Sequence, residues 1–192
     1  MAADRRSHPA RWVALAVAAV VALFFAVLAT REPAASRQAS SPLLGHPAPE
    51  ISGQSVLDSR AVRLSDSKGR FVLVNFVASW CVACAEEHDD LIKFSQRHRA
   101  AGDAEVLGVV FDDRDADVRG FFERRGGDWP VVSDPEGKVA LDYGVRGPPE
   151  SFLIDADGYV ISKIIGRVTA DGLDRLVQRA RAGEARRGEG ER

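Results

Sequence analysis

The sequence predicts an α/β domain in which a central mixed β-sheet is flanked by helices. Two observations lead to this prediction. Strand-like and helix-like segments alternate from Arg70 to Tyr143, which is the pattern of parallel strands joined by crossover helices. Further along, two strand-like segments are joined by Asp155–Gly158 (DADG), a connection typical of an antiparallel hairpin. The sheet is therefore expected to contain both parallel and antiparallel strands.

The first half of the domain has the pattern strand, helix, strand, helix. Arg70–Ala78 (RFVLVNFVA) is a continuous hydrophobic run, as expected for a strand that is covered on both faces. A helical stretch follows from about Cys81 to Ala101, and Glu105–Phe111 (EVLGVVF) predicts a second buried strand. Asp117–Arg125 then has helical character.

The second half adds a short strand and a short helix before the hairpin and a closing helix. The predicted segments, in chain order, are Trp129–Val132, Lys138–Tyr143, Ser151–Asp155, Tyr159–Ile165 and Thr169–Ala182. The closing helix has Leu173, Leu176 and Val177 on one face, and Thr169 is its expected N-cap.

An unbroken apolar run extends from Trp12 to Ala29, behind an arginine-containing N-terminus, residues 1–11. A helix needs roughly 20 apolar residues to span a bilayer, whereas the apolar part of a cleavable signal peptide has about 7–15. The run therefore predicts a transmembrane anchor over residues 12–29 with residues 1–11 in the cytoplasm. A cleaved signal peptide is the alternative, since Ala26 and Ala29 are small enough for cleavage. In both cases the rest of the chain is expected outside the cytoplasm, in the periplasm.

Residues 30–43 are rich in Ala, Ser and Pro and lack hydrophobic periodicity, which predicts a linker. The folded domain is expected to cover residues 44–182. The tail, residues 183–192 (GEARRGEGER), has little to bury and is expected to be disordered.

Composition excludes several classes of protein. The 192 residues carry a net charge of −2 with both signs interspersed, so no basic surface for nucleic acid is expected. The 2 cysteines, Cys81 and Cys84, are too few for a disulfide scaffold, and the 4 histidines do not stand at the spacing of a zinc site. No metal or cofactor is expected, and redox chemistry of the cysteine pair remains.

Cys81 and Cys84 form a Cys-x-x-Cys motif where a buried strand leads into a helix. Cys81 lies at the helix N-terminus, where unpaired backbone N–H groups favour an anion, so its thiol is expected to ionise readily and act as the nucleophile. Cys84 lies on the same side of the first turn and can resolve a mixed disulfide. Two buried core cysteines, or half of a metal site, are the alternatives, and the strand–motif–helix context favours the redox pair.

Three segments resemble one family. Val74–Cys84 is similar to the VNFWASWCxPC motif of membrane-anchored thiol–disulfide oxidoreductases of the TlpA/ResA/DsbE (CcmG) family, Tyr143–Asp155 to its YGVxGxPETFLID element, and Leu44–Pro49 to its LGxPAPxF start. The resemblance implies a thioredoxin-like fold with extra N-terminal strands, here around Ile51–Leu64. It also implies reduction of disulfides outside the membrane, commonly those of apocytochrome c, with electrons from a membrane donor of the DsbD/CcdA type.

The resemblance also implies roles for residues around the cysteines. Pro149 matches a cis-proline that guides a substrate strand, although from sequence alone a plain turn is the simpler interpretation. Pro148 has no backbone N–H, so only its carbonyl can bond to a peptide. Trp80 is expected to shield the thiolate and to offer an apolar contact surface. Glu150 matches an acidic groove position and is expected to contact a partner.

Glu87 lies three residues after Cys84, on the same helix face, and matches an acidic residue that the family keeps near the active site. A partly desolvated carboxylate there would have a raised pKa and could relay the proton of Cys84. A solvated glutamate beside Glu86 is the alternative.

Two other functions of the cysteine pair are alternatives to a disulfide reductase. A disulfide oxidase is the nearest one, but Val82 and Ala83 lack the histidine that oxidising relatives often place between the cysteines. A Cu(I)-delivery protein would use Cys81 and Cys84 as soft ligands, conceivably with His88. A position on the helix surface is the simpler expectation for that histidine.

Overall fold

The computed structural model describes residues 9–30 and 37–190, and the chain divides into two units, residues 1–34 and 35–192. In the first unit, α1 spans Pro9–Thr30 and contains the apolar run. No helix in the described part of the chain is both long enough and apolar enough to cross a membrane. Residues 1–8 of the expected cytoplasmic terminus lie outside the described residues.

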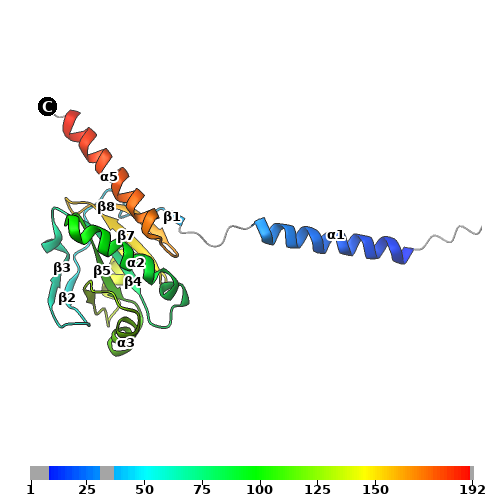
Figure 1. Cartoon of the computed structure of the whole chain (residues 1–192), viewed down its shortest axis with the longest axis horizontal. Coiled ribbons are helices and arrows are strands. Elements are labelled where there is room, and N and C mark those ends of the chain that lie inside the picture. The colour runs from blue at the N-terminus through cyan, green and yellow to red at the C-terminus, as the bar shows by residue number, and fades with distance from the viewer. Residues whose placement is uncertain (1–8, 31–36, 191–192) are drawn as a thin grey trace, which may run out of the picture. The chain divides into compact units, whose positions relative to one another are not determined.

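The second unit is built on a six-stranded sheet with the order β1-β8-β7-β4-β5-β6 (Figure 1). Strands β4, β5 and β6 are parallel to one another, whereas the β4–β7, β7–β8 and β1–β8 pairs are antiparallel. The expected mixed sheet is thus confirmed. The strands are β1 (Arg37–Ala39), β4 (Phe71–Val77), β5 (Ala104–Val110), β6 (Val131–Val132), β7 (Glu150–Ile154) and β8 (Val160–Ile165).

Helices cover both faces of this sheet, and every residue of β4 is buried. One apolar cluster joins alternate β4 residues such as Leu73 to α2 (Val82–Ala101), α3 (Asp115–Arg125) and α5 (Ala170–Gly190). The other joins the intervening residues, such as Val74, to α4 (Lys138–Tyr143). Because side chains alternate along a strand, the continuous apolar run supplies both clusters at once.

The extra N-terminal strands implied by the resemblance are present as a separate antiparallel pair. β2 (Ser52–Gln54) pairs with β3 (Ala61–Arg63), and a short 3-10 helix, η1 (Leu64–Ser67), follows. Ile51 and Leu64, which flank this strand pair, are buried in the apolar cluster that also contains Ala140 and Tyr143 of α4.

Two expected boundaries are wrong. Residues 37–39 of the expected linker form β1, which pairs with β8, so the domain begins before residue 44. An edge strand is held by hydrogen bonds of its backbone N–H and C=O groups, which every residue type except proline can form. The composition of residues 37–39 therefore did not reveal β1. The expected disordered tail is helical as far as Gly190, as part of α5. Its Ala, Glu and Arg residues have a high helix propensity. Residues 31–36 and 191–192 lie outside the described residues.

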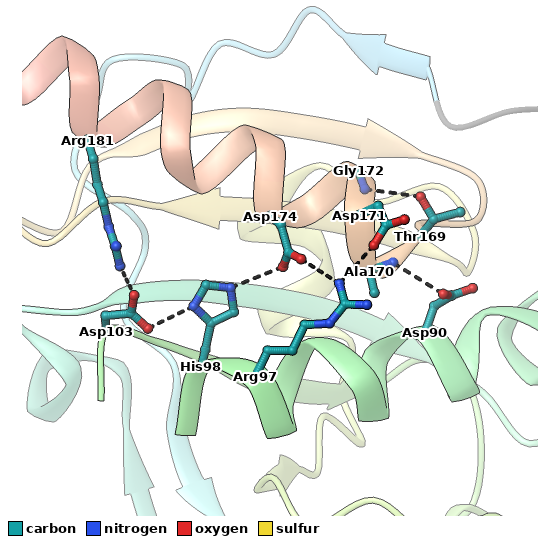
Figure 2. Close-up of polar contacts among 10 residues, drawn as sticks. All are labelled: Asp90, Arg97, His98, Asp103, Thr169, Ala170, Asp171, Gly172, Asp174 and Arg181. Atoms are coloured by element: carbon teal, nitrogen blue, oxygen red, sulfur yellow. Dashed lines mark hydrogen bonds and ion pairs between the residues drawn. The ribbon is translucent and has the colours of Figure 1, made fainter. Parts of the chain in front are cut away.

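Helix α5 is attached to α2 by a set of polar contacts (Figure 2). His98 lies between two carboxylates, with Nδ1 2.7 Å from Asp103 and Nε2 3.1 Å from Asp174. Arg97 also donates to Asp174, at 2.5 Å. Thr169 Oγ1 accepts the Gly172 N–H at 3.2 Å, which confirms the expected N-cap. We refer to Arg97, His98, Asp103, Asp171, Asp174 and Arg181 as the α2–α5 polar cluster.

Candidate active site

The two cysteines lie where β4 leads into α2, as predicted. A turn closed by the Cys81 N–H and the Ala78 carbonyl, 3.2 Å apart, connects the two elements. Cys81 is the N-cap of α2 and forms a disulfide with Cys84, and the Cα atoms of the two cysteines are 5.2 Å apart. The Cys84 N–H also donates to Cys81 Sγ at 3.0 Å, so the sulfur occupies the position that a capping oxygen takes in other helices.

This position suits a thiolate on Cys81. The first turn of α2 contains no acidic residue, so the partial positive charge of the helix N-terminus is not neutralised there. Cys81 is 6% exposed and Cys84 1%, so a substrate reaches Cys81 more readily. The order of exposure agrees with the predicted roles of nucleophile and resolving cysteine.

Glu87, three residues after Cys84 in α2, is buried rather than solvated beside Glu86. Its side chain is 1% exposed, and its two oxygens accept hydrogen bonds from Asn75 Nδ2 and from the Val168 N–H, each at 2.8 Å. Burial raises the pKa of Glu87 to about 7, and both hydrogen bonds oppose this shift because they stabilise the carboxylate. A carboxyl group with this pKa exchanges protons near neutral pH.

Asn75 is a further member of the site and was not predicted from the sequence. It lies within β4 and is buried, and its amide donates both to Glu87 and to Ser151 Oγ, the latter at 3.0 Å. The available signal was a polar residue within an otherwise apolar strand. Such a residue needs a buried partner, because an unpaired amide in a core is costly.

The peptide bond between Pro148 and Pro149 is cis, as the resemblance implied. Pro149 is buried and immediately precedes β7, where Glu150 pairs with Phe76 of β4. Since β4 ends at Val77, the proline loop lies at the same end of the sheet as the cysteines. The Pro149 carbonyl already accepts the Gly166 N–H at 3.0 Å, and Pro148 is half-buried.

Glu150 does not lie on an exposed groove surface, and its carboxylate is not placed to contact a partner directly. It is 2% exposed, and its Oε2 atom is 2.8 Å from Lys163 Nζ, which is also buried. Its other oxygen accepts the Arg146 N–H at 3.0 Å, while Lys163 donates to the Gly144 carbonyl at 3.0 Å. The buried pair therefore supports the loop that leads to the cis-proline. A sequence match gives the position along the chain but not the direction of the side chain.

Trp80, the residue before Cys81, is exposed, as the expected contact surface requires. Its side chain is 57% exposed, and its indole N–H donates to the Asp112 carbonyl at 3.1 Å. This bond fixes one edge of the ring and leaves most of its apolar surface open to a partner.

His88 is buried, contrary to the expected surface position. It is 1% exposed, its Nε2 atom is 2.8 Å from the Gly126 carbonyl, and its ring packs against Phe121, Phe122 and Trp129. Burial lowers its pKa, and the carbonyl requires Nε2 to carry a proton. Within the described residues, no three His, Cys, Asp or Glu side chains are grouped as metal ligands.

Comparisons with known proteins agree with this site. The Redoxin family description matches residues 43–177. The thiol:disulfide interchange protein DsbE of Allochromatium vinosum is 32% identical over 154 residues, which cover 77% of this chain and 83% of that protein. The thiol-disulfide oxidoreductase ResA of Bacillus thuringiensis (strain Al Hakam) is 34% identical over 118 residues, or 62% of this chain and 68% of its own. A crystal structure of a thiol:disulfide interchange protein of the thioredoxin family from Chlorobium tepidum TLS superposes with a TM-score of 0.65 and 27% identity, covering 74% of this chain and 99% of that one.

Proposed function

The chain belongs to the Redoxin family, and from this premise we propose that it is a thiol–disulfide oxidoreductase that reduces protein disulfides outside the cytoplasm. The observation that carries the proposal is the Cys81–Cys84 pair at the N-terminus of α2, the helix that also contains the buried Glu87. The fold is thioredoxin-like, in agreement with the structural relative.

In the proposed reaction, the Cys81 thiolate attacks one sulfur of a substrate disulfide and the other sulfur leaves as a thiolate. The Cys84 thiol then loses its proton and attacks Cys81 Sγ, which releases the reduced substrate and leaves the Cys81–Cys84 disulfide. The ionised carboxylate of Glu87 takes the proton of the Cys84 thiol. With a pKa of about 7, the carboxyl group exists in both its ionised and its protonated form near neutral pH. A dithiol donor returns two electrons and two protons to the pair.

The substrate and the donor are proposed from the resemblance to the TlpA/ResA/DsbE family. They are the haem-attachment disulfide of apocytochrome c and a membrane protein of the DsbD/CcdA type. The absence of a histidine at Val82 and Ala83 favours reduction over oxidation. Trp80, the cis-proline Pro149 and the Pro148 carbonyl are the proposed substrate contacts.

A trapping experiment tests the activity and the substrate together. In Cys84→Ser the mixed disulfide on Cys81 is not resolved, so the substrate should remain attached and be identified by mass spectrometry. Cys81→Ser is the matched control and should trap nothing. Recovery of apocytochrome c supports the pathway, and capture of unrelated exported proteins would indicate a general reductase instead.

The direction of electron flow needs a separate measurement. Equilibration of the pair with glutathione buffers gives its reduction potential, which should be well below that of a strong oxidant. A value near about −120 mV would contradict the reductase proposal and favour an oxidase.

We also propose that residues 12–29 direct the domain out of the cytoplasm, as a retained anchor or as a cleaved signal segment. Cell fractionation and N-terminal sequencing of the mature protein test this. Activity in the soluble cytoplasmic fraction of a chain that keeps Met1 would contradict export. A membrane-bound chain with an intact N-terminus would identify an anchor, and a shortened soluble one a signal peptide.

A further inference from the structure

Two loops meet beside Cys81, one after each of two neighbouring parallel strands. Strand β4 ends at Val77, whose carbonyl accepts the Phe111 N–H at 2.9 Å just beyond β5. From there β4 continues into the turn Ala78–Cys81, and β5 continues into the loop Asp112–Arg114. Because the strands are adjacent, the second loop lies alongside the turn that carries the nucleophile.

Asp113 connects the two loops through its carboxylate. Its Oδ2 atom accepts the Ser79 N–H at 2.6 Å, and its Oδ1 atom accepts the Arg114 N–H at 2.7 Å. The side chain is half-buried, so part of this contact is removed from water. One carboxylate therefore fixes the turn and the loop to each other.

The neighbouring residue Asp112 reinforces this arrangement through its backbone. Its carbonyl accepts the Trp80 indole N–H at 3.1 Å, and its φ is 44°, in the left-handed region that most side chains avoid. Aspartate tolerates this region better than most residues. The loop thus holds a restricted conformation that presents both the Asp113 carboxylate and the Asp112 carbonyl to residues 79 and 80.

The turn determines where the nucleophilic sulfur lies. Its last residue, Cys81, caps α2 only while Sγ lies 3.0 Å from the Cys84 N–H. Ser79 and Trp80 are the two central residues of the turn, and both are bonded to the Asp112–Arg114 loop. Movement of the turn would withdraw the sulfur from the helix N-terminus, where a thiolate is stabilised.

We propose that Asp113 is a positioning residue for the redox reaction, holding the Ala78–Cys81 turn so that the Cys81 sulfur remains at the N-terminus of α2. The inference rests on the proposed function of the cysteine pair and extends it to a residue outside the motif. The negative charge of Asp113 by itself disfavours a nearby thiolate. Its hydrogen bond to Ser79 favours a thiolate indirectly, because it holds the Cys81 sulfur at the helix N-terminus. The two effects have opposite signs, so substitutions separate them.

The experiment uses the full chain with the Cys84→Ser substitution. Serine keeps the backbone N–H of residue 84, which donates to Cys81 Sγ, and Cys81 is then the only thiol in the chain. Its readouts are the rate of Cys81 alkylation by iodoacetamide at pH 7 and the pH titration of thiolate absorbance. Asp113→Ala should slow alkylation roughly fivefold, as expected for loss of a helix N-terminus interaction, and should move the titration to higher pH. Asp113→Asn loses the charge and keeps only one acceptor oxygen for the two N–H donors, so its rate should lie between that of Asp113→Ala and that of the parent.

Two further variants keep the test decisive. Asp113→Ser can still bond to its own loop but is too short to reach Ser79, so it should be slow even if Asp113→Ala does not fold. Asp112→Asn removes the same charge from the same loop and keeps the backbone carbonyl, so it should be no slower than the parent. The inference is overturned if Asp113→Ser and any folded Asp113→Ala react within twofold of the parent. It is also overturned if Asp112→Asn is as slow as they are.

The alkylation and titration readouts require no disulfide substrate, so the positioning inference and the proposed function can fail separately. A parent protein that reduces no disulfide, with an Asp113 effect on Cys81 still present, contradicts only the function. An active parent with no Asp113 effect contradicts only the inference.

Discussion

At the scale of single residues, the site depends on the buried carboxyl group of Glu87 and on the two groups that donate hydrogen bonds to it. Asn75 supplies one bond to Glu87 and one to Ser151, and the Val168 N–H supplies the other bond to Glu87. Both donors stabilise the ionised carboxylate, while burial stabilises the neutral one, and burial prevails. A group balanced in this way responds to small changes in its surroundings.

The Glu150–Lys163 pair gives a prediction at this scale. Lys163→Met leaves the Glu150 carboxylate buried without its ion-pair partner, which should lower the free energy of unfolding by about 3–5 kcal/mol. The double variant Glu150→Gln with Lys163→Met should recover most of that loss, since the amide oxygen can still accept the Arg146 N–H. Urea unfolding at pH 7 measures both.

Lys138→Met is the matched control, because Lys138 pairs with Asp142 on an exposed helix surface. It should change the free energy of unfolding by less than about 1 kcal/mol. If Lys163→Met were equally mild, the buried pair would not support the proline loop.

At the scale of elements, α5 combines an apolar face with the α2–α5 polar cluster (Figure 2). Asp174→Asn weakens contacts with Arg97 and His98 at a partly exposed site, so it should lower the free energy of unfolding by only about 1 kcal/mol. Leu173→Ala removes a side chain that is 1% exposed and should cost about 2–5 kcal/mol. Urea unfolding compares the two variants, and an equal loss would contradict the view that packing dominates the attachment of α5.

Strand β1 gives a second prediction for an element. A chain that begins at Ser40 lacks β1 and exposes the edge of β8, whereas a chain that begins at Arg37 keeps the pairing. We expect the shorter chain to lose about 1–2 kcal/mol of unfolding free energy, from three lost cross-strand pairs, and to self-associate through the free edge. Urea unfolding and sedimentation at several concentrations test this. Identical behaviour of the two chains would show that β1 adds nothing to the domain.

At the scale of the whole molecule, Glu87 links the folding equilibrium to pH. Its pKa in the folded protein, about 7, lies above the ordinary value of 4.5, so the folded protein keeps a proton that the unfolded chain releases. The contribution of Glu87 to stability is therefore fully present below about pH 4.5, falls as pH rises to about 7, and is absent above it. The total change is roughly 3 kcal/mol.

Glu87→Gln tests this linkage because its amide does not titrate. Urea unfolding of the oxidised protein at pH 5 and pH 8 should show a fall in unfolding free energy for the parent that the variant lacks. His88, whose lowered pKa acts in the opposite direction, is the same in both proteins and cancels in the comparison. An equal fall in the variant would assign the pH dependence to other groups.

The sequence by itself determined the order of elements from β4 to α5, the mixed sheet and the cysteine pair. These follow from local patterns, because a run such as Arg70–Ala78 can only be covered on both faces, and a cysteine pair between strand and helix is fixed by its neighbours. The cis bond before Pro149 and the strands β2 and β3 followed from the family resemblance rather than from local physics.

Only the tertiary structure decided which way the polar side chains point and which distant groups meet them. Glu87, His88 and Glu150 are buried, and each is matched to a partner far along the chain: Val168, Gly126 and Lys163, respectively. Hydrogen bonds and ion pairs join single atoms across the folded core, and no periodicity in the sequence records such contacts. For the same reason β1, which is held by its backbone, had no signal in its side chains.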